Sequence, residues 1–270
     1  MQIVQRIDEA RAALDALRPR GTVGFVPTMG ALHDGHAALF RTARAECAVV
    51  ATSAFVNPLQ FDDPQDLAAY PPPGQEDARI AESEGVDVYF VPPPQEIYPH
   101  GHATRVEIGG PAVGFEGAAR PGHFAGVATV CLKLFSIVRP DVVYLGQKDA
   151  QQVAVLRQLV RDVHLPLEIR VVPTVREPDG LARSSRNARL SPAERARAAA
   201  IPRALRRAVE AHRTGGDPAA AARAALEGFE IDYVDVAHFD GRPTLVLAVR
   251  LGRTRLIDNV PLDDPGMAGL

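Results

Sequence analysis

The stretch Val23-Gly-Phe-Val-Pro-Thr-Met-Gly-Ala-Leu-His-Asp-Gly-His36 is the part of the chain around which the rest is organised. Its apolar run from Val23 to Val26 is ended by Pro27 and Gly30, which predicts a strand that runs into a tight turn. Asp34 is a candidate N-cap, and the residues after it form a helical apolar face: Ala37, Ala38, Leu39, Phe40 and Ala43. A turn between a strand and a helix leaves backbone N–H groups unpaired at the helix N-terminus, and an anion binds well there.

Two histidines flank Gly35 in this turn. The imidazoles of His33 and His36 can donate hydrogen bonds to phosphate oxygens, and Gly35 has no side chain to keep a ligand away from the backbone. The pair is also compatible with a partial metal site or with ordinary surface residues, although no nearby Cys, His, Asp or Glu cluster supplies further ligands. On this motif alone, a phosphate site and a turn without function are about equally supported.

The composition excludes several classes of protein. The chain has 270 residues, enough for two domains, with a formal net charge of −3 and 46% hydrophobic residues. It is therefore expected to be neither disordered nor a general nucleic-acid binder. No apolar run is long enough to span a bilayer, and the residues after Met1 lack a signal-peptide pattern. Cys47 and Cys131 stand in apolar surroundings, so we expect buried free thiols in a cytoplasmic protein.

Strands and helices are expected to alternate along the first part of the chain. Further strands are predicted at 48–55, 86–91, 142–145 and 167–172, with a short one near 105–108, and helices at 3–17, 76–84, 124–138 and 150–162. This alternation predicts an α/β fold with a parallel sheet and helices on both faces. Ligands bind beyond the carboxyl ends of such strands, so the segments 28–30, 57–60, 146–149 and 174–175 should line one edge.

The composition changes near residue 174. A polar loop covers residues 176–187, and Ser191-Pro192 then opens one long helix rich in Ala and Arg. A second helix starts at Asp217-Pro218, and β-rich runs follow at 231–237, 244–251 and 254–257, with a hairpin turn at 240–243. We therefore predict two domains, a larger one at 1–173 and a smaller α+β domain at 174–270.

Polar side chains near the strand ends suit a phosphorylated ligand and a small polar substrate. Lys148 follows a strand and can reach a phosphate as a point charge, while Ser184 to Arg186 offer two hydroxyls and a planar fork. Gln60 and Gln152 are neutral groups that can both donate and accept, which suits a hydroxyl and a carboxylate. Taken singly, each is at least as often an ordinary surface residue.

Glu76 and Asp77 form a carboxylate pair at the start of a predicted helix. Their oxygens are suitable Mg²⁺ ligands, but such a pair more often interacts with the helix dipole.

Several motifs together resemble one family. His33-Asp-Gly-His36 resembles the HxGH signature of a nucleotidyl-transferring superfamily with a Rossmann-like fold, and Arg183-Ser-Ser-Arg186 resembles its mobile second signature. The finer resemblance is to the pantoate–β-alanine ligase family, the pantothenate synthetases, and it covers nearly the whole chain. Its motifs occur in order: Pro27-Thr-Met-Gly-Ala-Leu-His33, Phe55-Val-Asn-Pro-Leu-Gln-Phe61, Arg120-Pro-Gly-His-Phe124, Gly146-Gln-Lys-Asp149 and Val175-Arg-Glu-Pro-Asp-Gly-Leu181.

The resemblance implies a two-step ligase. ATP and pantoate give pantoyl adenylate and pyrophosphate, and the amine of β-alanine then attacks the acyl carbon to give pantothenate and AMP. It also implies that the smaller domain acts as a lid, that ATP is used with Mg²⁺ and no tightly bound organic cofactor, and that the protein is a homodimer.

The resemblance also assigns residues to roles. The catalytic group is His33, His36, Lys148, Ser184, Ser185 and Arg186, with His36 as the candidate proton donor. The ATP site is Met29, Gly30, Ala31, Leu32, His33, Asp34, Gly35, His36, Gly146, Gln147, Lys148, Asp149, Val175, Arg183, Ser184, Ser185 and Arg186. Gln60 and Gln152 would bind pantoate, with Gln60 also near β-alanine, and Asp77 is the candidate Mg²⁺ ligand.

Two positions depart from the family pattern. Arg183 stands where the family usually has Met or Lys, so the phosphate loop gains a charge. The segment from Tyr70 to Pro73 is Tyr-Pro-Pro-Pro where Tyr-Pro-Arg-Thr is common, so Pro72 replaces an arginine, which weakens the Mg²⁺ assignment to Asp77.

The main alternative is a nucleotidylyltransferase, which shares the HxGH turn but moves AMP onto a phosphate ester. Such an enzyme needs basic residues for the acceptor phosphate where this chain has Gln60 and Gln152. A nucleotide-binding regulatory module has no use for the histidine pair together with the Ser-Ser-Arg loop. Nothing in the sequence resembles an anticodon-binding domain or a basic RNA face, which argues against a tRNA synthetase.

Overall fold

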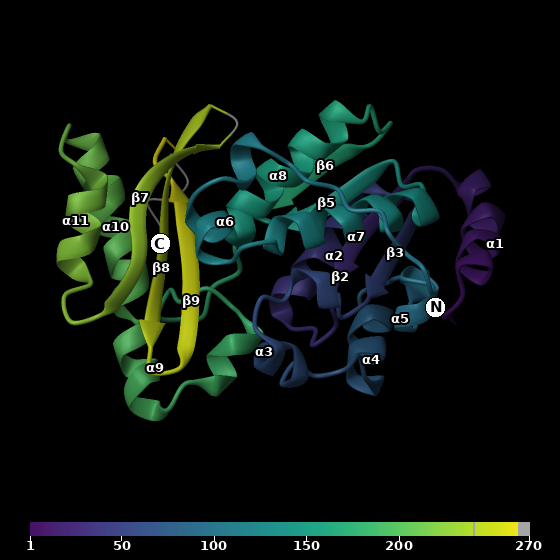
Figure 1. Ribbon diagram of the computed structural model, residues 1–270, viewed down its shortest axis with the longest axis horizontal. Helices are drawn as coiled ribbons and strands as arrows, with labels where there is room; N and C mark the ends of the chain where they lie inside the picture. The colour runs from purple at the N-terminus through teal and green to yellow at the C-terminus, as the bar shows by residue number, and fades with distance from the viewer. Residues whose placement is uncertain (240, 264–270) are drawn as a thin grey trace. The chain divides into compact units, whose positions relative to one another are not determined.

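The computed structural model describes residues 1–239 and 241–263, and the chain divides into two compact units (Figure 1). The first unit comprises Met1–Gly146 and Gln151–Val172, and the second comprises Gln147–Ala150 and Pro173–Leu270. The chain thus passes between the units on either side of residues 147–150 and again after residue 172. The hairpin turn predicted at 240–243 includes residue 240, which lies outside the described residues.

The first unit is built on a six-stranded parallel sheet, which confirms the predicted α/β fold. Its strands are β1 (Gln2–Val4), β2 (Val23–Thr28), β3 (Val49–Ala54), β4 (Val88–Phe90), β5 (Val142–Gly146) and β6 (Glu168–Val172). The spatial order is β1-β4-β3-β2-β5-β6. From β2 the chain adds β3 and β4 on one side and then returns to add β5 and β6 on the other. The direction of strand addition therefore reverses between β2 and β5, where open α/β sheets place their ligands.

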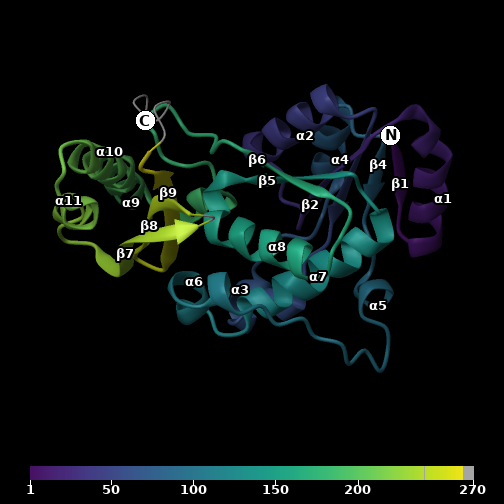
Figure 2. The same cartoon turned by 90° about the horizontal axis from the view of Figure 1, so that it is seen from above.

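Helices cover both faces of this sheet (Figure 2). The longer ones are α1 (Ile7–Leu17), α2 (Asp34–Glu46), α4 (Gln75–Ser83), α7 (His123–Val138) and α8 (Ala150–Asp162). Successive side chains of a strand point to opposite faces, so Phe25 packs in a core with α1, α7 and α8, and Val26 packs with α2 and α4. Short helices occur in the loops: α3 (Pro64–Ala68), α5 (Pro94–Ile97) and α6 (Phe115–Ala119). No helix among the described residues is long and apolar enough to cross a membrane.

The second unit has an antiparallel sheet of order β7-β8-β9. Its elements are α9 (Pro192–Ala198), α10 (Ala200–Arg213), α11 (Pro218–Ala225), β7 (Glu230–Phe239), β8 (Arg242–Leu251) and β9 (Thr254–Pro261). Leu205 of α10 and Leu226, just after α11, pack with Leu245 and Leu247 of β8 in a separate hydrophobic core. This arrangement confirms the predicted smaller α+β part of the fold.

Three predicted elements were wrong in detail. Residues 3–17 are not one helix, because Ile3 belongs to the edge strand β1 and pairs with Tyr89 of β4. Residues 105–108 form no strand; instead, the Val106 N–H donates to Oγ1 of Thr129 at 3.0 Å. The long helix after Ser191 is two helices that break at Ala199, since Pro202 has no N–H and its ring conflicts with the carbonyl one turn earlier.

Candidate active site

The turn after β2 is held by a buried carboxylate. Gly30 and Ala31 both have positive φ values, 85° and 51°, so the backbone reverses sharply. Asp77, only 6% exposed, accepts hydrogen bonds from the N–H groups of Ala31 at 3.1 Å, Leu32 at 2.7 Å and Gly74 at 3.1 Å. The carboxylate of Asp77 therefore fixes the turn to the start of α4 (Gln75–Ser83).

The Mg²⁺ role expected of Asp77 stays a prediction beside this structural role. Both of its oxygens already accept from backbone N–H groups, which cannot be moved without opening the turn. Over residues 1–239 and 241–263, no group of three or more His, Cys, Asp or Glu side chains is arranged to hold a metal ion. The described protein groups do not form an Mg²⁺ site of their own.

The histidine pair forms the start of helix α2. The N-cap is His33 rather than Asp34, which is the first helical residue. Nδ1 of His33 accepts the Gly35 N–H at 3.0 Å, and Nδ1 of His36 accepts the His33 N–H at 3.2 Å. The two rings lie 4.3 Å apart between centroids. Each imidazole thus acts as a capping group, a use that the helix signals in the sequence did not reveal.

These contacts determine where each neutral ring carries its proton. A ring nitrogen that accepts from a backbone N–H holds no hydrogen, so the neutral imidazoles of His33 and His36 are protonated on Nε2. Each ring therefore has its N–H on the side opposite the helix cap. The capping hydrogen bonds thus fix the orientation of two Nε2–H donors.

Gly35 is needed here for a reason other than the one we expected. A Cβ at this position would come within 2.8 Å of Cε1 and 3.0 Å of Nδ1 of His33. The glycine therefore allows the His33 ring to lie against the backbone, where it receives the Gly35 N–H.

The segment that carries Gln60 is held directly against helix α7. A Cβ on Gly126 would lie 2.2 Å from the Leu59 carbonyl oxygen, so only glycine permits this packing. Asn57 donates through Nδ2 to the Gly126 carbonyl at 3.1 Å and to Oε1 of Gln60 at 2.9 Å. Since Oε1 of Gln60 is an acceptor here, its amide N–H₂ is the part that can serve a substrate carboxylate.

Two side chains of the Arg-Pro-Gly-His motif hold the backbone of the same segment. Nδ1 of His123 lies 2.8 Å from the Gln60 carbonyl oxygen, and Arg120 donates to that oxygen at 3.2 Å. The motifs that contain Arg120, His123 and Asn57 indicate no role for these three residues. Their role depends on contacts with Gln60, which is distant in sequence from Arg120 and His123.

Gln152 lies in the first turn of α8 and is half-buried. The adjacent Gln151 is buried and serves the backbone, because it accepts the Glu116 N–H and donates to the carbonyls of Pro111 and Gly114. Of the two neighbouring glutamines, Gln152 is the one that can take part in substrate binding.

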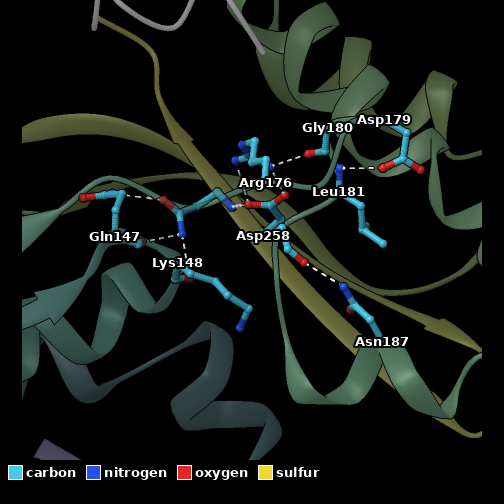
Figure 3. Close-up of polar contacts among 10 residues, drawn as sticks. Gln147, Lys148, Arg176, Asp179, Gly180, Leu181, Asn187 and Asp258 are labelled. Atoms are coloured by element: carbon cyan, nitrogen blue, oxygen red, sulfur yellow. Dashed lines mark hydrogen bonds and ion pairs between the residues drawn. The ribbon is translucent and has the colours of Figure 1, made fainter. Parts of the chain in front are cut away.

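The turn with Lys148 belongs to the second unit, as does β9. It is a 3₁₀ turn over Gln147–Asp149, and the Lys148 ammonium lies 3.5 Å from Oδ1 of Asp149. Asn259 of β9 donates to the carbonyl oxygens of Gln147 and Lys148. Figure 3 shows this turn together with Arg176 and Asp258.

The Ser-Ser-Arg loop is built on a small hairpin of the second unit. The Arg183 N–H donates to the Val175 carbonyl at 2.9 Å, and the Glu177 N–H donates to the Leu181 carbonyl at 2.8 Å. Ser184 then caps a 3₁₀ helix over Ser185–Arg189 through a hydrogen bond from the Arg186 N–H. The loop therefore starts at a fixed point, which is the open end of the hairpin, where Arg183 is paired with Val175.

Glu177 anchors this loop from inside the hairpin. Its carboxylate accepts a hydrogen bond from Asn187 at 2.9 Å and forms an ion pair with Arg195. A terminal guanidinium nitrogen of Arg183 lies 4.0 Å from Oε1 of Glu177. Burial raises the pKa of Glu177, but the hydrogen bonds from Asn187 and Arg195 outweigh it, so the net pKa is below its ordinary value. The charge that Arg183 adds to the loop therefore lies close to a carboxylate.

The residues expected at the site are divided between the units. The first unit holds Met29 to His36, Gln60, Asp77, Gly146 and Gln152, and the second holds Gln147, Lys148, Asp149, Val175 and Arg183 to Arg186.

Comparison with known proteins identifies relatives over almost the full chain. The sequence model of the family described as pantoate-beta-alanine ligase matches residues 2–261. A pantothenate synthetase of Rhizorhabdus wittichii is 48% identical, over 97% of this chain and 99% of that protein.

Solved structures agree with this relationship. A pantothenate synthetase from Thermus thermophilus superposes with a TM-score of 0.91 at 44% identity, over 97% of this chain and 99% of that one. A pantoate-beta-alanine ligase from Francisella tularensis, complexed with beta-gamma ATP and beta-alanine, has a TM-score of 0.85 at 38% identity, over 98% of both chains.

Proposed function

The chain belongs to the pantoate-beta-alanine ligase family, and we propose how its residues carry out that family's reaction. It is an enzyme that forms an amide bond. The reaction is the ATP-dependent condensation of pantoate with β-alanine, which passes through a pantoyl adenylate. The ligand-bound relative from Francisella tularensis supports ATP and β-alanine as substrates. The nucleotidylyltransferase alternative is not favoured, because the relatives over nearly the full chain are ligases.

In the first step the pantoate carboxylate attacks the α-phosphorus of ATP. A bond forms between a carboxylate oxygen and phosphorus, the bond to the bridging oxygen of pyrophosphate breaks, and negative charge builds up on the departing group. The protein's task is therefore positioning and charge stabilisation. In our proposal, the Nε2–H groups of His33 and His36 donate hydrogen bonds to phosphate oxygens.

One observation carries this assignment: both imidazoles accept a backbone N–H through Nδ1. The helix cap thereby fixes the tautomer and orientation of each ring before ATP binds. Donors that are fixed in advance stabilise developing charge without reorganising during the reaction, which makes them effective.

The residues of the second unit are proposed to act on the phosphates. Lys148 would supply a point charge and Arg186 a planar fork, with the hydroxyls of Ser184 and Ser185 as further donors. We propose that this unit acts as a lid that excludes water from the acyl adenylate. ATP is expected to be used with Mg²⁺. The described residues include no group of three or more His, Cys, Asp or Glu side chains that could hold the ion without the phosphates of ATP, and no step here passes through it.

In the second step the amine of β-alanine attacks the acyl carbon of the adenylate. The C–N bond forms, the bond from the acyl carbon to the phosphate oxygen breaks, and AMP leaves while the nitrogen loses a proton. Gln60 and Gln152 are proposed to hold the pantoyl part, with the N–H₂ of Gln60 directed to an oxygen of pantoate or β-alanine. Homodimer formation and a cytoplasmic location are further proposals.

Isotope exchange tests the reaction directly. With Mg²⁺ and pantoate but without β-alanine, the protein should exchange labelled pyrophosphate into ATP, and added β-alanine should then give equal amounts of AMP and pantothenate. A nucleotidylyltransferase would need a phosphorylated acceptor instead. Folded protein that binds ATP but shows no pantoate-dependent exchange would contradict the proposal.

A matched pair of variants tests the role of His36. His36→Asn keeps an acceptor near the position of Nδ1 for the helix cap but removes the Nε2 donor, and His36→Ala removes both. Both variants should lose about 10²–10³-fold in kcat for exchange, since a fixed donor to the transition state is gone. Only His36→Ala should also lose stability, by about 1 kcal/mol. Near-wild-type turnover in folded His36→Asn would mean that Nε2 does not take part.

A further inference from the structure

Asn259 is a buried amide that uses its hydrogen bonds on one neighbouring turn. It is 4% exposed and lies on β9 (Thr254–Pro261). Its Nδ2 donates to the carbonyl oxygens of Gln147 at 2.9 Å and Lys148 at 2.8 Å, and its Oδ1 accepts from Nε2 of Gln147 at 3.0 Å. Two successive carbonyls held by one side chain define the direction of the peptide between them, and with it the start of the Lys148 side chain.

The preceding residue on β9 holds the other phosphate-binding segment. Asp258, whose side chain is 1% exposed, accepts hydrogen bonds from both terminal nitrogens of Arg176, at 2.7 and 3.1 Å. Arg176 also donates to the Gly180 carbonyl at 3.0 Å within the hairpin that carries the Ser-Ser-Arg loop (Figure 3). Asp258 Oδ1 in turn accepts the Asn259 N–H at 2.8 Å, so the two anchors are linked to each other.

We propose that Asn259 is a positioning residue for Lys148, acting from the same strand that anchors the Ser-Ser-Arg hairpin. Lys148 follows β5 in sequence, yet its carbonyl is hydrogen-bonded to Asn259 of β9. Lys148 is therefore expected to move with the second unit. The inference rests on the proposed function, since it takes Lys148 to act on the phosphates of ATP. It predicts that the lysine and the loop reach ATP as one rigid group.

The side-chain chemistry favours positioning over simple filling of space. A buried apolar residue would leave the two carbonyls without partners, while a buried acid would repel them, so an amide meets the requirement of this place. A shift of about 1 Å in a group that contacts the transition state is enough to reduce a rate by about 100-fold. Small changes at Asn259 should therefore appear in the rate of the first step.

The test uses the full-length protein and pyrophosphate exchange with ATP and pantoate. Lys148→Ala provides the reference and should reduce kcat by about 10²–10³-fold. Asn259→Asp keeps the shape but turns acceptor oxygens toward the two carbonyls, and should reduce kcat by about 10–100-fold, with the KM for pantoate near wild type. Asp232→Asn is the control, because this carboxylate holds Arg250 and Arg255 of the same sheet and makes no described contact with residues 147–149.

The double variant separates positioning from general structure. If Asn259 acts through Lys148, Asn259→Asp should add less than about threefold to the loss already caused by Lys148→Ala, whereas independent effects multiply. Multiplying losses, or equal losses in Asp232→Asn, would overturn the inference. If Asn259→Asp does not fold, Asn259→Ser keeps one donor and takes its place, with the same outcome expected.

The two hypotheses fail in different ways. Wild-type exchange by Lys148→Ala would overturn the role of Lys148 and this inference together. Wild-type exchange by Asn259→Asp, beside an impaired Lys148→Ala, would overturn the inference alone.

Discussion

Replacing Asp77 distinguishes a structural carboxylate from a metal ligand. In Asp77→Ala, the N–H groups of Ala31, Leu32 and Gly74 lose their acceptor. Gly74 is exposed, so water can replace the carboxylate there, but Leu32 is buried and Ala31 half-buried. A buried donor without a partner costs about 1–3 kcal/mol, so two of them give about 2–6 kcal/mol of unfolding free energy. Asp77→Asn retains one acceptor oxygen and should lose about half as much.

The measurement is urea unfolding, with Mg²⁺ titration of pyrophosphate exchange as the second readout. Glu76→Gln is the matched control, because Glu76 is the neighbouring carboxylate and is 70% exposed in its surface pair with Arg79. It should change the unfolding free energy by less than about 0.5 kcal/mol. The reasoning is refuted if Asp77→Asn unfolds like the wild type while needing much more Mg²⁺ for exchange.

Other predictions follow from the same contacts. Gly35→Ala should reduce kcat by about 10–100-fold with little loss of stability, because the new Cβ displaces the His33 ring; unchanged exchange would contradict the packing argument. Gln60→Ala and Gln152→Ala should each raise the KM for pantoate by about 5- to 100-fold and leave ATP binding nearly unchanged, and equal losses for both substrates would show a general effect on the site. Acidification should loosen the Ser-Ser-Arg loop through Glu177. Because its folded pKa lies below the ordinary 4.5, its stabilising contribution is complete above that pH and is lost as the pH falls through the folded pKa. Between pH 7 and about pH 3.5, the unfolding free energy measured by urea titration should therefore fall less in Glu177→Gln than in the wild type. An equal fall in both proteins would show that Glu177 does not contribute to the acid sensitivity.

The parts of the fold that the sequence predicted well depend on local patterns. Helix α8 matches its predicted bounds, 150–162; β3 differs from its prediction by one residue at each end and β5 by one residue at its C-terminal end. These segments have strong apolar periodicity and clear end signals. Where a local signal was weak, the prediction failed: β1 has three residues, and its strand character comes from pairing with β4.

The contacts that support the candidate site could not be predicted, because they join distant parts of the chain. Asp77 and Leu32 are 45 positions apart, and Asn259 and Lys148 are 111 positions apart. No periodicity or spacing rule connects such pairs. The capping role of His33 was missed for another reason: imidazole is an unusual N-cap, so the neighbouring Asp34 was the better candidate by residue type.

Charge is distributed unequally over the proposed site, and this has a mechanistic consequence. The groups expected to act from the first unit, His33, His36, Gln60 and Gln152, are neutral donors and acceptors, whereas the cations Lys148, Arg183 and Arg186 all belong to the second unit. Pantoate recognition needs orientation, which neutral hydrogen-bonding groups supply, while the departing pyrophosphate needs positive charge. On the proposed function, substitutions of the cations should slow the release of pyrophosphate and leave pantoate affinity intact. The attack of β-alanine on a preformed adenylate should then be less sensitive to them, because only the single phosphate of AMP gains charge in that step, whereas the first step releases pyrophosphate.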